Sequence, residues 1–499
     1  MTTSGSQNPE TAAMWGLRTW AMTPPNRPDV THDAVILLPG IMGSVLVDAE
    51  TGKQLWGLSG RALARAWVGG ESLERLVVTA DERRGRTDRV TATEVLTLPA
   101  AAPVLRGIEP YDLLRDAIKG VTLPGAVKDF PYDWRLSVEH NAGLLAAAAR
   151  SHLDGWRRVV AGDPRLSDEP PPRLVFVAHS MGGLIAAAAL HADPRLADDT
   201  RAVVTLGTPF HGSVLAVAML KGDHKVSGLP QARLRALAVS APGMYDLLPI
   251  YRCLDMGTDV LPLDFRHIAS LGGDADLARE ALATRRGMRE SARPIPGHRP
   301  AIGIFHPTPT SLSLDGGVLT LHTHGHRTGT DGLLVRDLAT GIPEPVNREG
   351  DGTVYRDAAF PHHSAPAAYV PARHGALTRH KAALSHVAAV LTEHDEHMGP
   401  PASRGATGIT LPDQAQVGQP WTLDIHTTRS PTTLRASITP VDGGDTTELR
   451  LSRGDGPDRG SLLRAPHTVT SPGLFRVTVD TGSGPGTELT ELLLVVEAS

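Results

Sequence analysis

One stretch constrains the fold more than any other, because an apolar run, a serine between small residues and an Ala-rich run follow one another without a break. Residues 174–178 predict a buried parallel strand, and residues 184–190 predict a helix. Ser180 stands at the joint, with Ala178 two positions before it and Gly182 two positions after it. A sharp strand-to-helix turn brings these flanking positions together, so only small side chains fit. The pattern predicts a nucleophile elbow; a helix N-cap without chemistry is the plainer alternative.

Length, charge and cysteine content exclude several classes of protein. At about 150 residues per domain, 499 residues predict two to four domains. The net charge is -5 and no basic block is present, so we expect no nucleic-acid partner. A single cysteine, Cys253, excludes an intramolecular disulfide and a cysteine-based zinc site. Neither a signal-peptide pattern nor an apolar run of about 18 residues is present, so we expect a cytoplasmic protein.

A second loop has the composition of an oxyanion-binding turn. Residues 34–38 predict a strand, and Pro-Gly-Ile-Met-Gly follows at once. A glycine-flanked turn lets backbone N–H groups approach a substrate carbonyl without interference from side chains. We expect Ile41 to supply one amide, with Met42 as the next choice. The other amide is that of Met181, at the N-terminus of the helix after Ser180. A tight turn without chemistry is the alternative for the first loop.

Alternating strands and helices around the elbow predict the rest of this domain. Residues 202–206 form another buried apolar run, and residues 301–305 and 367–370 predict later strands. This order is typical of a doubly wound, mostly parallel sheet, here within residues 31–395. Two irregular segments interrupt it, and we interpret residues 50–107 and 214–300 as cap or lid insertions. For the first of them, a long solvated loop is the alternative.

The residues that would activate the serine follow in the expected chain order. A serine needs a base to take its proton, and the base needs a carboxylate to orient it. On a doubly wound sheet with an elbow the order is serine, then acid, then histidine, each at the carboxyl end of a strand. Asp351, within Gly-Asp-Gly, and His374, after the last predicted strand, fit that order with Ser180. Asp357 is the nearest competing acid.

Three other histidines could compete with His374. His380 and His386 fall inside the predicted closing helix, residues 377–391, where surface or packing roles are expected. His179 directly precedes the serine and should point away from it, so we interpret it as a buried, hydrogen-bonded histidine.

A separate group of histidines has metal-like spacing. His322, His324 and His326 alternate, which would place all three on one face of a strand. Because no fourth ligand is evident in the sequence, a solvated hairpin is favoured over a metal site. We therefore expect neither a metal nor another cofactor.

The two ends of the chain differ from the central domain. Residues 1–30 are polar and Pro-rich and predict a flexible arm, and residues 396–408 are typical of a linker. Beyond them, residues 409–499 show period-two alternation with turn residues roughly every ten positions. We interpret this segment as an immunoglobulin-like β-sandwich without a disulfide. Its favoured role is a spacer or a docking module, with a protein or glycan as its partner.

Taken together, five motifs resemble the lecithin:cholesterol acyltransferase family, which includes lysosomal phospholipase A2 and phospholipid:diacylglycerol acyltransferase. The resemblance covers about residues 33–392 and rests on Pro39-Gly40-Ile41-Met42-Gly43, Pro131-Tyr132-Asp133-Trp134-Arg135, Ala178-His179-Ser180-Met181-Gly182, Gly207-Thr208-Pro209-Phe210-His211-Gly212-Ser213 and Gly350-Asp351-Gly352-Thr353-Val354.

The resemblance implies an α/β-hydrolase fold with Ser180, Asp351 and His374 as the triad and Ile41 and Met181 as the oxyanion donors. It implies cleavage of an acyl ester, that of a lipid or phospholipid, with transfer of the acyl group to water or to another hydroxyl. Asp133 and Arg135 would brace the elbow through a partly buried pair.

The composition of the first insertion bears on membrane contact. Within residues 50–107 only Trp56 and Trp67 are aromatic, so we expect at most transient contact with a membrane surface.

Two other functions remain open. An esterase for small esters would differ only in the size of its pocket. A non-enzymatic protein that docks through the C-terminal sandwich is the alternative from another class.

Overall fold

The computed structural model describes most of the chain. Of the predicted N-terminal arm only residue 30 is described, and of the predicted linker only residues 407 and 408. The described residues are 30–57, 71–97, 111–167, 169–223, 230–291, 293–328, 333–347, 349–361, 367–392, 407–412, 414–427, 430–441, 444–454, 462–480 and 488–497.

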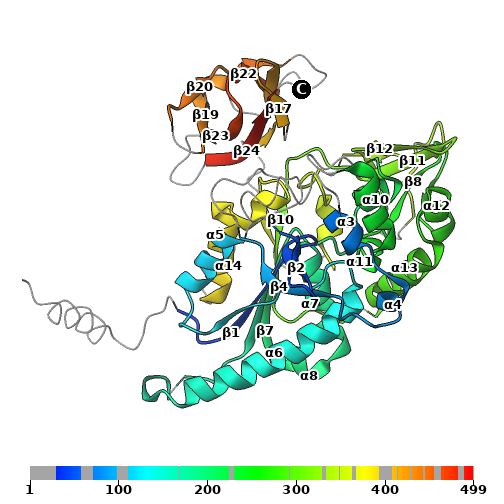
Figure 1. The fold of residues 1–499 in the computed structure, drawn as a ribbon. Helices are drawn as coiled ribbons and strands as arrows, with labels where there is room; N and C mark the ends of the chain where they lie inside the picture. Colours follow the sequence, from blue (N-terminus) through cyan, green and yellow to red (C-terminus); the bar gives the residue numbers. More distant parts are fainter. Residues whose placement is uncertain are drawn as a thin grey trace, which may run out of the picture.

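A six-stranded parallel sheet forms the centre of the larger domain (Figure 1). Each neighbouring pair is parallel, in the order β15-β10-β7-β6-β1-β5. β1 and β6 are buried along their whole length, as expected of apolar strands covered on both faces. The predicted doubly wound sheet is confirmed. Its strands are β1 (Ala34–Leu38), β5 (Val127–Asp129), β6 (Leu174–His179), β7 (Thr200–Leu206), β10 (His298–Gly303) and β15 (Ala368–Val370).

Helices cover both faces of this sheet. Alternate residues of β1 enter two different cores: Ala34, Ile36 and Leu38 pack with one set of helices, and Val35 and Leu37 pack with the other. The first core contains α6 (Val138–Ala161), α7 (Met181–Ala192) and α8 (Pro194–Asp198); the second contains α5 (Asp112–Gly120) and α14 (Lys381–Leu391).

The closing helix starts later than the sequence predicted. Residues 375–378 form a short 3-10 turn, and α14 begins only at Lys381. His380 is its N-cap, and its side chain accepts a hydrogen bond from the amide of Ala382. The placement of His380 inside the helix was therefore wrong, because the side chain satisfies a free amide at the helix end.

The described parts of the first insertion form a small sheet and two short helices. These are β3 (Gln54–Trp56), β4 (Val90–Val95), α3 (Glu71–Leu76) and α4 (Ala80–Arg83), and the two strands pair with β2 (Ser44–Asp48), which precedes the insertion. Trp56 is buried, its ring meets that of Trp134 edge to face, and its indole N–H donates to the carbonyl of Met42. Trp56 is thus a core residue. Trp67 lies outside the described residues.

The second insertion shares a sheet with a segment that follows β10. The sheet order is β12-β11-β8-β9, so strands from residues 252–262 and 311–322 lie side by side. This pairing was not foreseen. The elements of the insertion are α9 (Val214–Lys221), α10 (Gln231–Ser240), α11 (Pro242–Tyr245), β8 (Arg252–Asp255), β9 (Val260–Pro262), α12 (Phe265–Ser270) and α13 (Ala275–Glu290). The segment after β10 contains β11 (Ser311–Asp315) and β12 (Val318–His322). It also contains β13 (Gly325–His326) and β14 (Pro345–Val346), which pair in a separate two-stranded sheet.

The C-terminal strands form two sheets around one apolar core, drawn in orange and red in Figure 1. One is β16-β18-β22-β21 and the other β17-β24-β23-β19-β20. Their assignment as immunoglobulin-like stays a prediction. The strands are β16 (Thr407–Thr410), β17 (Gln414–Gln416), β18 (Pro420–Thr427), β19 (Arg435–Pro440), β20 (Thr447–Leu449), β21 (Ser452–Arg453), β22 (Leu462–Thr468), β23 (Gly473–Asp480) and β24 (Glu488–Val496).

Candidate active site

Ser180 lies in a strained turn between β6 and α7. Its φ is 51° and its ψ is −125°, values that few residues other than glycine adopt. The turn needs small neighbours: a Cβ on Gly182 would lie 2.5 Å from the carbonyl oxygen of Pro39. The serine is buried, and its amide donates to the carbonyl of Leu206 at the end of β7. The backbone therefore holds Ser180 at the carboxyl edge of the sheet.

His374 lies between the serine and a carboxylate. Its Nε2 is 2.9 Å from Ser180 Oγ, and its Nδ1 is 2.8 Å from Asp351 Oδ2. Because a carboxylate accepts, Nδ1 carries the proton and Nε2 is left to face the hydroxyl. The three predicted residues thus form one hydrogen-bonded chain although 194 positions separate Ser180 from His374.

Several contacts fix the carboxylate of Asp351. Its Oδ1 accepts from the amides of Thr353 and Val354, at 2.9 and 2.7 Å, which leaves Oδ2 for the histidine. The amide of His374 also donates to the carbonyl of Asp351. The side chain is almost fully buried, so the pair is shielded from water.

Two glycines make room for the acid and the histidine. A Cβ on Gly207, whose φ is +58°, would lie 2.9 Å from Asp351 Oδ2 and 3.0 Å from His374 Nδ1. A Cβ on Gly303, at the end of β10, would lie 2.3 Å from Asp351 Cβ. The approach of Asp351 to His374 thus requires glycine at the carboxyl ends of β7 and β10.

The loop after β1 packs against the serine. A Cβ on Gly40 would lie 2.9 Å from Ser180 Cβ, so the backbone of Gly40 packs directly against the elbow. Ile41 is the next residue along this loop. The next residue, Met42, has a φ of 63° within the turn closed by the Gly43 amide and the Gly40 carbonyl. Met181 is the first residue of α7, where an amide has no acceptor within the helix. Both predicted donors belong to segments next to Ser180.

A hydrogen-bonded chain that the sequence did not reveal joins this loop to His374. The Gly40 amide donates to Tyr111 Oη at 2.7 Å, and Tyr111 Oη lies 2.8 Å from His179 Nδ1. His179 Nε2 lies 3.1 Å from the carbonyl oxygen of His374. A carbonyl can only accept, so Nε2 carries the proton and Tyr111 donates to Nδ1.

His179 is buried and hydrogen-bonded, as predicted, but its ring lies against His374 rather than apart from the site. Burial, together with the neighbouring His374, lowers the pKa of His179 to about 3. The imidazole is therefore neutral near pH 7. Nothing in the sequence pattern identifies Tyr111 as its partner, because the two residues are 68 positions apart.

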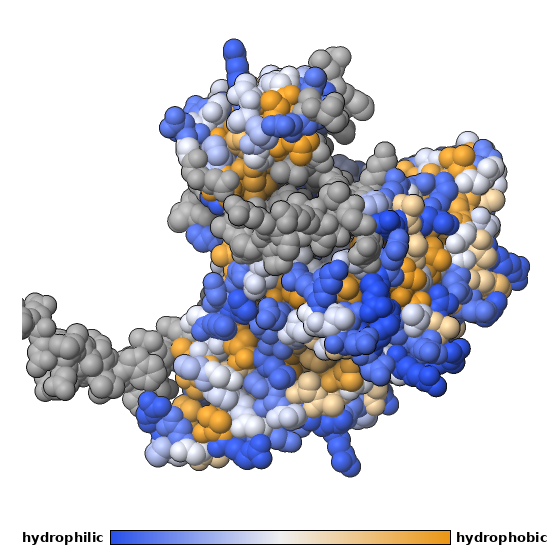
Figure 2. Space-filling model, in the orientation of Figure 1, coloured by the Kyte–Doolittle hydropathy of each residue, from blue (hydrophilic) through white to orange (hydrophobic). Residues whose placement is uncertain are grey.

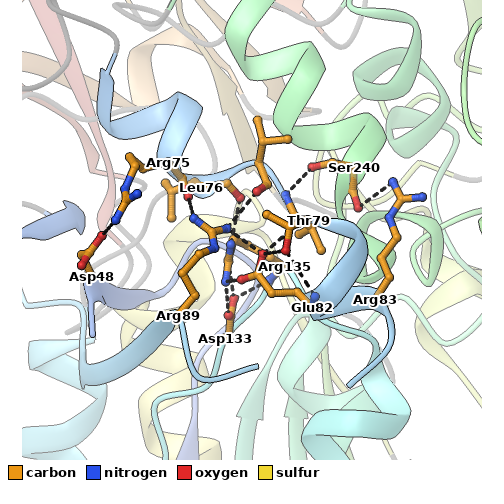
Figure 3. A network of polar contacts seen from close by, with 12 residues as sticks. Asp48, Arg75, Leu76, Thr79, Glu82, Arg83, Arg89, Asp133, Arg135 and Ser240 are labelled. Atoms are coloured by element: carbon orange, nitrogen blue, oxygen red, sulfur yellow. Dashed lines mark hydrogen bonds and ion pairs between the residues drawn. The ribbon is translucent and has the colours of Figure 1, made fainter. Parts of the chain in front are cut away.

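Asp133 and Arg135 form part of a larger buried network (Figure 3). Arg135 contacts both carboxylate oxygens of Asp133, at 2.9 and 2.6 Å, and also Glu82 Oε1 at 2.9 Å. Arg89 reaches the other oxygen of Glu82 at 2.6 Å. The network joins α4 of the first insertion to the loop after β5, and the sequence did not predict the part played by Glu82.

Charges of opposite sign stabilise the ionised forms in this network. Burial raises the pKa of Glu82, but the hydrogen bonds from Arg89 and Thr79 and the charge of Arg135 outweigh burial, so the pKa lies below its ordinary value. For Arg135, burial lowers the pKa, and its two carboxylate partners reverse the shift.

The competing acid and histidines lie elsewhere. Asp357 belongs to a 3-10 turn, residues 356–359, and its carboxylate lies 3.3 Å from Arg356 Nε. His386 is buried within α14, with Nε2 3.4 Å from the carbonyl oxygen of Arg299. Of the predicted acids and bases, the structure brings only Asp351 and His374 to Ser180.

The three alternating histidines do not share one strand. His322 ends β12, His326 belongs to β13, and His324 lies between them. The expectation of a single strand face was wrong, because the chain leaves the hairpin at His322 to pair with β14. Asp255, from β8, lies beside His324 and His326.

Comparisons with known proteins show similarity over part of the chain. A family model described as "PGAP1-like alpha/beta domain" matches residues 147–228, which include the elbow. An uncharacterized protein of Saccharomyces cerevisiae is 26% identical over 177 residues, which are 35% of this chain and 23% of that protein. The chain thus spans about a quarter of the length of that relative.

Solved structures resemble this chain only weakly. A metagenomic carboxyl esterase is 14% identical, with 73% of this chain and 76% of that chain covered and a TM-score of 0.31. A cohesin module from Clostridium perfringens is 12% identical over 19% of this chain and 98% of that chain, with a TM-score of 0.12. Neither likeness carries an argument about activity.

The fold follows from the sheet, the elbow and the family match. The central parallel sheet and the positive φ of a serine between β6 and α7 are features of an α/β-hydrolase fold, and the PGAP1-like match covers the segment that contains β6, α7 and β7.

Proposed function

We propose that the protein is a serine acyl hydrolase or O-acyltransferase in which Ser180 is the nucleophile, His374 the base and Asp351 the residue that orients the base. One observation carries the proposal: His374 lies within hydrogen-bond distance of both Ser180 Oγ and Asp351 Oδ2. A nucleophile, a base and an orienting carboxylate in this arrangement are what acyl transfer requires.

In the first step, His374 Nε2 takes the hydroxyl proton as Ser180 Oγ attacks the ester carbonyl. The negative charge moves to the carbonyl oxygen, which accepts hydrogen bonds from the amides of Ile41 and Met181. Asp351 stabilises the imidazolium through the Nδ1 proton. When the tetrahedral intermediate collapses, Nε2 returns its proton to the leaving alcohol and an acyl-serine remains.

In the second step, water or an alcohol attacks the acyl-serine. His374 takes the proton of the attacking hydroxyl and gives it to Ser180 when the ester bond to the enzyme breaks. The same residues serve hydrolysis and transfer. The choice between them depends on which hydroxyl reaches the acyl group.

We propose a lipid or phospholipid ester as the acyl donor. The motifs that resemble the lecithin:cholesterol acyltransferase family support this class of substrate. Apolar residues also reach the surface over the sheet that contains β8, β9 and β12, visible as orange areas in Figure 2. They include Met256, Leu261 and Val318, and such residues suit transient contact with a lipid surface. In the described part of the chain, each helix is too short or too polar to cross a bilayer.

A fluorophosphonate probe tests the nucleophile. We expect it to label the parent protein and not Ser180→Ala, whose ester turnover falls by roughly three to six powers of ten. Ser240→Ala is the control, because Ser240 is buried to the same extent, at 6% exposed, and both partners of its hydroxyl among the described residues are backbone groups. Labelling that persists in Ser180→Ala would contradict the assignment.

Chain length and surface dependence test the donor. We expect turnover of long-chain phospholipid in vesicles to exceed that of short soluble esters. Equal or higher turnover of the short esters would favour the small-ester esterase. A parent protein that is folded but neither labelled nor active would favour the binding protein.

A further inference from the structure

Three potential metal ligands converge at one end of the sheet that joins the second insertion to the segment after β10. His324 Nε2 lies 3.7 Å from Asp255 Oδ2, and His326 Nε2 lies 3.5 Å from the same oxygen. One ligand atom from each residue lies within 4.8 Å of those of the other two. Both distances to the carboxylate are longer than a hydrogen bond, so neither imidazole is hydrogen-bonded to this oxygen of Asp255.

The separations suit a tetrahedral site. With ligand atoms at about 2.0–2.1 Å from zinc, neighbouring ligand atoms lie about 3.4 Å apart. The two contacts of Asp255 are close to that value. His324 has room to complete the geometry, because its side chain is 40% exposed, whereas that of His326 is 6% exposed.

Pairing of strands brings these residues together. β11 runs parallel to β8, with Leu312 opposite Leu254, so Asp255 ends a strand beside β11. β12 returns antiparallel to β11, and Ser311 Oγ donates to the carbonyl of His324 at 2.6 Å. The backbone around the histidines is therefore fixed by the same hairpin that adjoins Asp255.

We propose that Asp255, His324 and His326 bind one Zn²⁺ ion, with water as the fourth ligand. Two imidazoles and one carboxylate form a donor set that zinc prefers. His322 is not part of the set, because its Nε2 lies 3.0 Å from Ser313 Oγ.

Such an ion would join two parts of the chain. Asp255 belongs to the second insertion, and the two histidines belong to the segment that runs from β10 to Asp351. The ends of that segment are paired by hydrogen bonds between the backbones of His306 and Gly350, next to Asp351. Zinc would hold the middle of the segment to β8 and thereby stabilise the fold, independently of any catalytic step.

Metal binding to the full chain without an affinity tag tests the proposal. After treatment with a chelator and dialysis, we expect the protein to bind one Zn²⁺ per chain and its Tm to rise by several degrees. Bound Co²⁺ should give the visible absorption of a four-coordinate site. His324→Ala, at a partly exposed position where a change should not impair folding, should lose at least about tenfold in zinc affinity.

Two further variants sharpen the test. His326→Ala should lose affinity as His324→Ala does, whereas His191→Ala, in the last turn of α7 and outside the cluster, should bind zinc like the parent. His322→Ala should also retain binding. Unchanged affinity in His324→Ala and His326→Ala would overturn the proposal, as would a loss in His322→Ala equal to that in His324→Ala.

Discussion

The imidazole of His179 lies against that of His374, with ring centroids 4.9 Å apart and the Nε2–H of His179 donating to the carbonyl of His374. A charged His179 would oppose the imidazolium that the proposed mechanism forms at His374. Burial, the main cause of the low pKa of His179, keeps it neutral. The residue before the serine therefore supports the base in two ways: by a hydrogen bond and by remaining uncharged.

This relationship predicts how stability depends on pH. The pKa of His179 falls from 6.5 to about 3 on folding, so the unfolded chain takes up its proton at a higher pH than the folded chain. The contribution of the neutral His179 to the free energy of unfolding is complete above pH 6.5 and is lost as the pH falls toward 3. Urea unfolding between pH 7 and 4 should show a loss approaching about 1.4 kcal/mol per pH unit for this proton.

His380 adds to the same trend, because burial lowers its pKa to about 4. His179→Gln should reduce the pH dependence of the unfolding free energy by about one proton and leave the part due to His380. An unchanged slope in that variant would contradict the assignment of a neutral, buried His179.

The choice between two acids can be tested directly. Asp351→Asn should lower ester turnover by roughly 10⁴-fold, because an amide no longer stabilises the imidazolium or fixes the Nδ1–H tautomer. Asp357→Asn, in which the altered side chain pairs with Arg356, should keep turnover within a few-fold of the parent. Single-turnover kinetics with a chromogenic ester would measure both, and a reversed order would make Asp357 the acid.

Gly207 should be required for activity because of the space that it leaves for Asp351 and His374, and not only because of its positive φ. In Gly207→Ala, the new methyl group would press on Asp351 Oδ2 and His374 Nδ1, so kcat should fall at least about tenfold. Gly85→Ala is the matched control, since Gly85 also has a positive φ, +95°, but a Cβ there meets no atom within 4 Å. It should lose some stability and no activity. Equal effects on kcat would mean that only backbone strain matters.

The buried network of Figure 3 should contribute strongly to stability. Arg135→Ala leaves the carboxylates of Asp133 and Glu82 without their shared partner, at a cost of about 3–5 kcal/mol in the free energy of unfolding. Arg84→Ala, which removes an arginine that pairs with the exposed carboxylate of Asp81, should cost much less. Chemical denaturation would compare them, and similar losses would contradict a special role for the network.

Local patterns in the sequence were sufficient to predict the sheet and the elbow. The apolar runs of β1, β6 and β7 and the small residues around Ser180 each reflect a requirement of one short segment. Chain order then led to Asp351 and His374. The structure places His374 beside Ser180 and Asp351 beside His374; their catalytic roles remain a proposal.

Contacts between distant segments could not be predicted in this way. Tyr111 reaches His179 from the start of α5, and Glu82 reaches Arg135 from α4. Asp255 of β8 lies beside His324 and His326. In each case the partner is an ordinary residue in its own segment, without a motif around it. The packing of Trp56 against Trp134 is a contact of the same kind, because the two residues lie far apart along the chain.

The order of the elements along the chain has a consequence for protein synthesis. The strand before His374 is β15, which forms one edge of the central sheet and is the last of its strands to be translated. A nascent chain that has emerged only as far as β10 contains Ser180 but neither Asp351 nor His374, so its hydroxyl has no base to deprotonate it. If the proposed triad is correct, esterolytic competence arises only when the ribosome has released the final strand of the sheet.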